Sequence, residues 1–336
     1  MSRKTADPLR FADHARYIPG QEKGHYESYF LRANHPKKPV AFWIRYTVFA
    51  PRGRPEDAIG EVWAVYFDGE KQEHVAVKDE FPMSVCAFNT NGLAAKVGEC
   101  VLDHGKLSGE ATAGQDKIAW EMGYGTESEP LFLLPLKLYN APFPKAKALV
   151  PRPMAAFTGK LVVNGKYVPV KDWVGSQNHN WGEKHTDDYA WGQVAGFDDA
   201  PDSFLEIATG RIRLGPVWTP YMSPMVLRHN GRQYALNSLV QTVKARGSFD
   251  YFDWKVRSDG PEFSMEARIT APRESFVCLN YYNPPGGVKH CLNSKIASCR
   301  LTLMKKGGKP EVLNTENRAA FEILTDDRDH GVAVRV

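Results

Sequence analysis

The feature that most constrains this chain is a side-chain alternation with a period of two, in segments that are apolar on both faces. In the run Val40–Ala50, one face carries Val40, Phe42, Ile44, Tyr46 and Val48, and the other carries Ala41, Trp43, Arg45, Thr47 and Phe49. The run Glu61–Asp68 behaves in the same way. A period of two is that of a β-strand. Apolar character on both faces is typical of a barrel wall that encloses an apolar cavity.

The same alternation recurs along the chain and predicts an all-β protein. The further strand-like runs are Tyr26–Ala33, Glu73–Lys78, Lys96–Leu102, Lys117–Tyr124, Leu131–Tyr139, Tyr189–Phe197, Ser203–Thr209, Leu236–Val243, Tyr251–Arg257, Phe263–Thr270, Ser275–Tyr282 and Lys295–Lys305. Asn164-Gly165 and Asn230-Gly231 predict two-residue hairpin turns, because Asn-Gly readily adopts positive φ angles. Glu316–Leu324 fits either a short helix or a strand. No long segment has a helical period, so sandwiches or barrels are expected.

The chain has 336 residues, a length that favours two domains. We place the boundary just after the polar block Gly175–Asp188. This predicts an N-terminal arm over 1–24, a first domain over 25–188 and a second domain over 189–336. The Pro-rich segment Pro135–Pro153 has two interpretations. An edge strand followed by a long loop is favoured over a basic, apolar flap across a cavity mouth.

Composition argues against several classes of partner. Lys and Arg number 43 against 39 Asp and Glu, and they are scattered, so a nucleic-acid partner is not expected. No segment approaches the ~18 apolar residues of a membrane helix, and the N-terminus does not resemble a signal peptide. The five cysteines form no C-x-x-C pair. We therefore expect a cytoplasmic protein with buried free thiols, whose oligomeric state the sequence leaves open.

Common catalytic and cofactor motifs are absent from the sequence. There is no G-x-S-x-G, S-x-x-K, P-loop, G-x-G-x-x-G or H-E-x-x-H pattern. His179 and His185 are six residues apart, and with Asp187 and Asp188 they could form a ligand set. Nothing makes that set specific, however, so a polar loop is the favoured interpretation. We expect neither a metal nor an organic cofactor.

One polar block, Trp173–Glu183, stands out from the apolar strands. Consecutive amides and an imidazole are poor core material unless each finds a partner. In a structural interpretation, Asn178, His179 and Asn180 tie an inter-domain corner together and Trp181 plugs the base of a barrel. In a functional one, His179 donates or accepts a proton in the cavity, held in one tautomer by an Asn. The structural interpretation is favoured.

Several segments together resemble a known family. They are AFWIRYTVFAP at Ala41–Pro51, GEVWAVYFDG at Gly60–Gly69, GSQNHNWGEKH at Gly175–His185, AWGQVAGFD at Ala190–Asp198 and YYNPPGGVKHCLNSKIASC at Tyr281–Cys299. The chain resembles the AttH-like proteins from about Tyr26 to its end. These are grouped with hydroxyneurosporene synthase, the carotenoid hydratase, and more distantly with tocopherol cyclase and fungal lipocalin-like Diels–Alderases.

The resemblance implies two lipocalin-like (calycin-type) β-barrel or sandwich domains. It also implies an apolar cavity in which active relatives, without metal or organic cofactor, add water to an alkene or fold a chain for cyclisation. Their shared chemistry would be protonation of a double bond, with aromatic faces stabilising positive charge. Such relatives often carry an acidic residue just before the H-N-W-G core, where this chain has Asn178.

The nearest replacement acid is Glu206, in the following predicted strand. An inward-facing Glu206 among apolar groups would have a raised pKa and could act as an acid. Alternatively it faces solvent or pairs with Arg211 or Arg213. The candidate catalytic residues are thus His179 and Glu206. The candidate substrate-binding residues are Trp43, Arg45, Gln177, Asn178, Asn180 and Trp181. For Arg45, stacking on Trp43 at a barrel rim is favoured over an inward-facing position.

Two functions remain open from the sequence. Both start from an apolar, lipid-like ligand (isoprenoid, polyene or polyketide-like) held in a barrel cavity. In the first, the protein catalyses a cofactor-independent hydration, isomerisation or cyclisation. In the second, it is a non-catalytic, lipocalin-like lipid carrier. Two facing polar groups able to exchange protons would favour the enzyme, and a wholly apolar cavity would favour the carrier.

Overall fold

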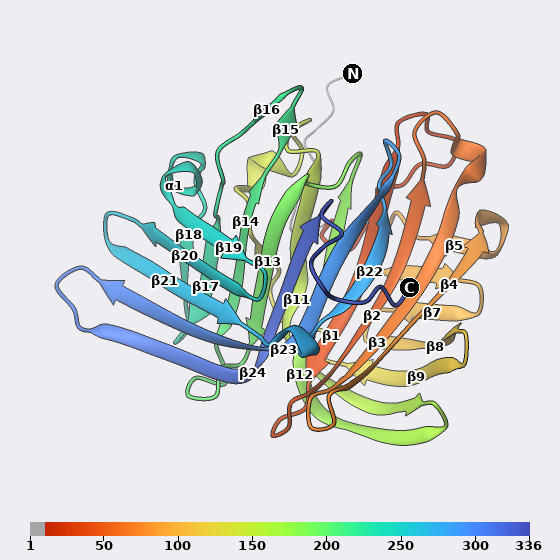
Figure 1. Ribbon diagram of the computed structural model, residues 1–336, viewed down its shortest axis with the longest axis horizontal. Helices are drawn as coiled ribbons and strands as arrows, with labels where there is room; N and C mark the ends of the chain where they lie inside the picture. Colours follow the sequence, from red (N-terminus) through yellow and green to blue (C-terminus); the bar gives the residue numbers. More distant parts are fainter. Residues whose placement is uncertain (1–10) are drawn as a thin grey trace.

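The computed structural model describes residues 11–336 and consists almost entirely of two β-sheets (Figure 1). Residues 1–10 of the expected N-terminal arm lie outside the described residues. The strands of the first sheet are β1 His25–Asn34, β2 Val40–Ala50, β3 Ile59–Asp68, β4 Glu73–Pro82, β5 Cys86–Phe88, β6 Ala94–Val97, β7 Cys100–Asp103, β8 Lys106–Ala113, β9 Asp116–Tyr124, β10 Leu131–Phe132, β11 Ala146–Val163 and β12 Lys166–Gly182.

The second sheet begins at Asp188 and forms the other half of the molecule. Its strands are β13 Asp188–Ala195, β14 Phe204–Arg211, β17 Met225–His229, β18 Arg232–Leu236, β19 Arg246–Asp250, β20 Asp253–Asp259, β21 Phe263–Thr270, β22 Val277–Tyr282, β23 Val288–Lys305 and β24 Pro310–Thr325. A separate hairpin joins β15 Arg213–Leu214 to β16 Val217–Trp218, and one short helix, α1, spans Leu239–Lys244.

The two sheets share one topology. In each, an antiparallel meander ends in a long hairpin that pairs back with the first strand: β12 with β1 in the first sheet, and β24 with β13 in the second. The long hairpins β11–β12 and β23–β24 contain register shifts, which let the strands bend. Two β-barrel domains of the predicted class are therefore present, related by topology although the sequence shows no evident repeat.

Both predicted Asn-Gly turns are confirmed. Asn164 and Gly165 connect β11 to β12 with φ angles of 50° and 78°. Asn230 and Gly231 connect β17 to β18 with φ angles of 51° and 70°. Positive φ at both central positions is the geometry of the two-residue hairpin turn that the sequence predicted.

Three of the expected strands are wrong in part. Leu131–Tyr139 is a strand only over β10 and then forms a 3-10 turn at Leu136–Leu138, next to Pro135, which cannot donate to a ladder. The run Leu236–Val243 gives way to α1 because Ser238 and Gln241 form a reciprocal capping box. The run Lys96–Leu102 is divided into β6 and β7 by a turn. The ambiguous segment Glu316–Leu324 lies within strand β24.

Strands that are apolar on both faces pack against their own barrel core on one face and against the other domain on the second. One face of β2, including Phe42, Ile44 and Tyr46, fills the interior of the first barrel. The other face, including Trp43, packs against residues of the second domain such as Trp191. The expected cavity inside a barrel is therefore wrong in its location: both barrel interiors hold a hydrophobic core, and the second apolar face belongs to the domain interface.

Arg32 on β1 is the main polar link across this interface. Its side chain is fully buried, and it donates from Nε to Gln193 Oε1 at 3.0 Å and from Nη2 to the Gln193 carbonyl at 2.8 Å. It also donates to Asn34 and to the carbonyl of Arg318. Burial lowers the pKa of Arg32 to about 10, which leaves the guanidinium charged at neutral pH.

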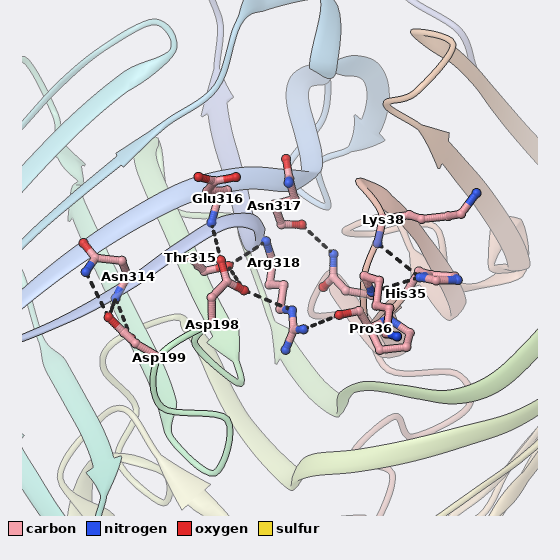
Figure 2. Close-up of polar contacts among 12 residues, drawn as sticks. His35, Pro36, Lys38, Asp198, Asp199, Asn314, Thr315, Glu316, Asn317 and Arg318 are labelled. Carbon is pink, nitrogen blue, oxygen red and sulfur yellow. Dashed lines mark hydrogen bonds and ion pairs between the residues drawn. The ribbon is translucent and has the colours of Figure 1, made fainter.

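A second set of contacts joins the domains at the loop between β1 and β2 (Figure 2). Arg318 of β24 donates to the carbonyl of Pro36 and pairs with Asp198 at 3.3 Å. Asn34 donates to the carbonyl of Asn317 at 3.0 Å. Asp198 in turn accepts from the Glu316 backbone N–H at 2.8 Å. The two sheets are thus held by directional hydrogen bonds as well as by apolar packing.

We predict that Arg32→Met lowers the free energy of unfolding by about 3–5 kcal/mol, because it leaves several buried acceptors without a donor. Arg32→Lys should recover little of the loss, since a lysine cannot reach the same forked set of acceptors. Urea denaturation followed by tryptophan fluorescence measures the effect. The matched control Arg257→Met removes an exposed arginine and should cost below about 1 kcal/mol. Equal losses for the two methionine variants would contradict this role.

Candidate functional site

A cavity of about 360 Å³ lies between the two domains. Its walls come from the inter-domain faces of both sheets and are largely apolar and aromatic. Tyr26, Phe30 and Trp43 line it from the first domain, and Tyr189 and Trp191 line it from the second. The volume lies within the ~300–1,000 Å³ of typical small-molecule pockets. The cavity therefore has the size and lining expected of an apolar ligand site.

The polar block of the sequence is part of strand β12, not a loop, so its side chains alternate between two faces. Asn178 and Asn180 face the cavity. Gln177 donates to Asp13 at 3.2 Å, and Trp181 lies against Arg16 of the N-terminal arm. Gln177 and Trp181 are therefore not among the residues that line this cavity, because the period of a strand turns them to the opposite face.

Two glycines let neighbouring backbones approach this strand. A Cβ at Gly175 would lie 1.7 Å from the carbonyl oxygen of Arg32, and one at Gly182 would lie 2.4 Å from that of Lys145. Both distances are shorter than any non-bonded contact allows. The glycines that bracket the block therefore serve the close packing of β12 between β1 and β11.

His179 is fully buried next to the cavity, and both of its ring nitrogens are occupied. Nδ1 lies 2.7 Å from the carbonyl oxygen of Ala12, and Nε2 lies 2.7 Å from Glu27 Oε1. A carbonyl and a carboxylate can only accept, so each ring nitrogen faces an acceptor. The imidazole also stacks on Tyr29 at 4.3 Å. This geometry is that of a clasp holding the N-terminal arm against β1 and β12.

Glu27 is the partner that makes the clasp stable. Besides His179, its carboxylate accepts from His25 at 3.1 Å and from the backbone N–H groups of Arg16 and Tyr17. Burial by itself would raise the pKa of Glu27, but the hydrogen bonds and charges of His179 and His25 hold it at about 2. Glu27 is therefore a buried, fully satisfied carboxylate, and it does not supply a proton near neutral pH.

Glu206 has the opposite character and lines the cavity. It is 2% exposed, and it accepts from Trp191 Nε1 and from Gln193 Nε2, each at 2.8 Å. Burial raises the pKa of Glu206 to about 7, although both hydrogen bonds and the charge of Arg32 act to lower it. It does not pair with Arg211, which binds Asp188 instead. A carboxyl group that exchanges its proton near neutrality therefore borders an apolar cavity.

Gln193 connects this acid to the first domain. Its Nε2 donates to both Glu206 Oε2 and Asn178 Oδ1, the latter at 2.7 Å, and its Oε1 accepts from Arg32 and from Ser176 Oγ at 2.6 Å. The amide therefore uses both protons and both lone pairs. Asn178 is thus connected to Glu206 through the single amide of Gln193. Asn178 occupies the place where active relatives of the resembled family often have an acid.

Two further charged groups lie around the cavity. Glu322, in its wall, accepts from the fully buried Lys295 at 2.7 Å, and burial lowers the pKa of Lys295. Arg45, also in the wall, donates to Ser28 and lies 4.3 Å from the ring centre of Tyr281 but 6.0 Å from that of Trp43. Arg45 thus lies over Trp43, the contact that the sequence favoured, but it lies closer to Tyr281, and it is buried in the cavity wall.

The residues considered as a weak metal set have other contacts. His185 lines the cavity, stacks on Tyr26 at 3.9 Å and has a pKa lowered by burial to about 3. Asp187 pairs with Lys184, and Asp188 pairs with Arg211. His185 and Asp187 thus lie in a polar loop, as the sequence favoured, whereas His179 lies in strand β12 and Asp188 begins β13.

A different group of potential ligand atoms lies in the second domain. Among the described residues, Cys278, His290 and His330 bring their sulfur and nitrogen atoms within 4.8 Å of one another. The backbone N–H of Val332 donates to His330 Nδ1 at 3.1 Å, which places the ring proton on Nε2. That proton is donated to His290 Nδ1 at 2.7 Å. In this arrangement the two imidazoles form a hydrogen-bonded pair, with the Cys278 sulfur 3.8 Å from His330 Nε2.

The Pro-rich segment lies at the cavity and not along an edge away from it. Leu133, Leu134, Leu138 and Phe143 all line the pocket, and Phe143 is 49% exposed. A short edge strand, β10, and a loop are present, as the favoured interpretation expects, but the loop lines the cavity. The alternative of an apolar, basic flap at the cavity mouth describes its position.

Several residues of the site were not identified from the sequence. Trp191 and Gln193 lie in the quoted segment Ala190–Asp198, but no role followed from that quotation alone. Glu27 lies beside Tyr26 in its strand and Glu322 lies between Phe321 and Ile323, and a charge next to large apolar side chains in a strand is a signal for a buried, partnered group. Their partners come from distant strands, which the sequence does not indicate.

We predict that His179→Gln lowers the free energy of unfolding at pH 7 by about 3–5 kcal/mol, because it leaves the buried Glu27 carboxylate without its imidazole partner. The Glu27 pKa is depressed, so this stabilisation is present above about pH 4.5 and is lost as the pH falls toward 2. The difference in the free energy of unfolding between variant and wild type should accordingly shrink on acidification. Urea titrations from pH 7 to pH 3 measure it, with the exposed His104→Gln as control. A gap independent of pH would contradict the clasp.

Comparisons with known proteins address the fold. No protein-family model matches the chain. Two proteins of Mycobacterium tuberculosis, the uncharacterized proteins MT0513 (strain CDC 1551) and Rv0493c (strain H37Rv), are each 26% identical to it over 202 residues. The matched region is 58% of this chain and 58% of each relative, which is less than two thirds of their length.

Solved structures match nearly the whole chain at low sequence identity. A protein of Nitrosomonas europaea assigned as an AttH (NE1406) has a TM-score of 0.56 at 12% identity, covering 93% of this chain and 98% of that one. Kievitone hydratase from Nectria haematococca has a TM-score of 0.56 at 11% identity, and CghA has 0.55 at 10%. Each covers 93% of this chain, and the matches span 94% and 93% of those proteins.

Among residues 11–336, no helix has the length and apolar character needed to cross a membrane.

These similarities to solved structures bear on the fold alone. The agreement over both domains confirms the resemblance that the sequence segments suggested. The chain has the paired β-barrel fold of the AttH-like proteins.

Proposed function

We propose that the protein binds an apolar, alkene-containing small molecule in the inter-domain cavity and protonates a carbon–carbon double bond through Glu206. Hydration, isomerisation or cyclisation would follow from that one step. The observation that carries the proposal is a buried carboxyl group with a pKa of about 7 in the wall of an aromatic cavity. A solved protein of the same fold is named a hydratase, which supports this class of reaction.

The hydrogen bonds around Glu206 suit a proton donor. Trp191 and Gln193 each donate to one carboxyl oxygen, which fixes the plane of the group. Because both neighbours are donors, the acid proton cannot be directed at either of them, and the cavity is where an acceptor can lie. The proton is then available to a bound ligand at a pH near the pKa, which is where general acids are most effective.

The proposed step is balanced by this carboxyl group and water. The Glu206 O–H bond breaks, a C–H bond forms with the π electrons of the alkene, and the neighbouring carbon becomes cationic beside the new carboxylate. In hydration, water adds to that carbon and its proton returns to Glu206. In isomerisation, the cation loses a different proton to Glu206. In cyclisation, a further double bond of the ligand first attacks the cation and closes the ring, and the resulting cation then loses a proton to Glu206. The Trp191 and Trp43 rings can stabilise the positive charge.

The cavity also indicates a polar group on the ligand. Among the described residues, Trp43 Nε1 and Asn180 Oδ1 are buried polar atoms without a hydrogen-bond partner, and both side chains line the cavity. One is a donor and the other is an acceptor. A mainly apolar ligand that carries a hydroxyl or carbonyl oxygen would therefore fit better than a pure hydrocarbon, since buried unpaired groups are costly.

We predict that Glu206→Gln reduces turnover by about 100-fold or more while ligand affinity changes little, because the amide keeps the shape but not the acid proton. Polyene, isoprenoid and polyketide-type alkenes are incubated with protein in D2O, and new carbon-bound deuterium is detected by mass spectrometry. In D2O the proton that Glu206 transfers is a deuteron, so hydrated products, cyclised products and products with a shifted double bond all carry the label. The exposed Glu99→Gln is the matched control.

The alternative function has a distinct outcome in this experiment. If the wild-type protein binds these compounds but none gains deuterium, the lipid-carrier function is favoured. If deuterium enters at the same rate in Glu206→Gln, the protein is an enzyme in which another group supplies the proton. Affinity is measured separately by the shift in melting temperature with each compound.

We further predict that kcat/KM falls about tenfold per pH unit above pH ~7, because Glu206 must be protonated to act. Stability provides an independent measurement. The pKa of Glu206 is raised in the folded state, so ionisation weakens the folded protein as the pH rises from about 4.5 through 7. The free energy of unfolding of Glu206→Gln, relative to that of wild type, should thus rise by about 3 kcal/mol between pH 5 and pH 9. A constant difference across this range would contradict the assignment.

A further inference from the structure

The mouth of the cavity is surrounded by exposed apolar side chains. More than half of the large apolar side chains that the structure describes as exposed belong to three segments, 131–149, 210–222 and 236–247. Each segment also supplies cavity-lining residues, such as Leu138, Ile212 and Leu239. Figure 1 shows β15, β16 and α1 at the same end of the molecule. We call these three segments the rim.

The exposed part of the rim is well formed. In the hairpin of β15 and β16, Leu214 and Val217 are 61% and 64% exposed, and Trp218 is 39% exposed. In α1, Val240 is 63% and Val243 is 49% exposed. Exposed apolar groups gathered in one place mark an interaction surface, whereas single ones are ordinary.

The charge of the rim is strongly one-sided. Its three segments contain seven Lys and Arg and no Asp or Glu, whereas the whole chain contains 43 Lys and Arg and 39 Asp and Glu. Two of the seven pair with acids outside the rim, Lys145 with Glu183 and Arg211 with Asp188. Lys137, Arg213 and Lys244 are exposed. The rim therefore combines apolar projections with positive charge.

We propose that the rim docks the cavity mouth on the surface of an anionic lipid bilayer. Tryptophan, leucine and valine side chains can enter the headgroup region, while neighbouring lysine and arginine attract anionic lipids. This combination distinguishes a bilayer from a second copy of the chain, because two identical basic rims would repel each other. Docking there would let an apolar ligand pass between the lipid phase and the cavity without crossing water.

The test measures binding of the full chain to vesicles, without any substrate. Phosphatidylcholine vesicles are compared with vesicles that also contain phosphatidylglycerol, in a flotation assay. We expect binding to the anionic vesicles that weakens as salt is added. The triple variant Lys137→Glu, Arg213→Glu and Lys244→Glu should bind at least about 100-fold more weakly, since each positive charge removed costs roughly fivefold and each negative charge introduced adds repulsion.

Two further variants complete the design. Lys166→Glu, Lys306→Glu and Lys309→Glu reverse three exposed charges outside the rim and should bind like wild type. Trp218→Ser with Val240→Ser removes apolar projections and should weaken binding with the charges intact. Circular dichroism and melting temperature establish that each variant is folded.

Each alternative result counts against docking. Equal binding to neutral and anionic vesicles, or equal losses for the two charge-reversal variants, would overturn the proposal. So would sedimentation showing that the rim forms a dimer that Trp218→Ser with Val240→Ser disrupts, since the occupant would then be a second copy. Because no turnover is measured, the proposal can fail while the acid chemistry of Glu206 holds, and the reverse is also possible.

Discussion

The structure depends on a buried polar connection between two apolar sheets. Gln193 accepts from Arg32 and Ser176 and donates to Asn178 and Glu206, so one amide joins strands of both domains. Because two donors fix its oxygen, its nitrogen must face Asn178 and the acid. The same connection sets the register of the domain interface and the orientation of Glu206, in a region from which water is largely excluded.

Two glutamates show how environment decides protonation. Glu27 and Glu206 are both buried, and burial raises the pKa of each. Glu27 has two histidines and backbone N–H donors around it, and these bring its pKa to about 2. Glu206 has two neutral donors and a more remote arginine, and its pKa stays at about 7. The first therefore suits a structural clasp, whereas the second suits proton transfer.

Much of the fold could be predicted from the sequence because strand periodicity and Asn-Gly turns are local signals. Leu236–Val243 has a strand-like pattern, but a capping box outweighs it and a helix forms instead. Apolar character on both faces of a strand predicts that both faces are covered, but it does not say what covers each face, so a cavity between the barrels is not evident from the sequence. Glu206 could be proposed from its strand neighbours, but its partners Trp191 and Gln193 could not, since cross-strand register is set by long-range pairing.

The central claim is that Glu206 holds a proton near neutral pH in the wall of the cavity. Infrared difference spectroscopy of wild type against Glu206→Gln, over a pH titration, observes the carboxyl C=O stretch of this residue directly. The account predicts a protonated-carboxyl band that is missing in the variant and disappears in wild type with a midpoint near pH 7. A Glu206 that is already ionised throughout the range above pH 5 would contradict it.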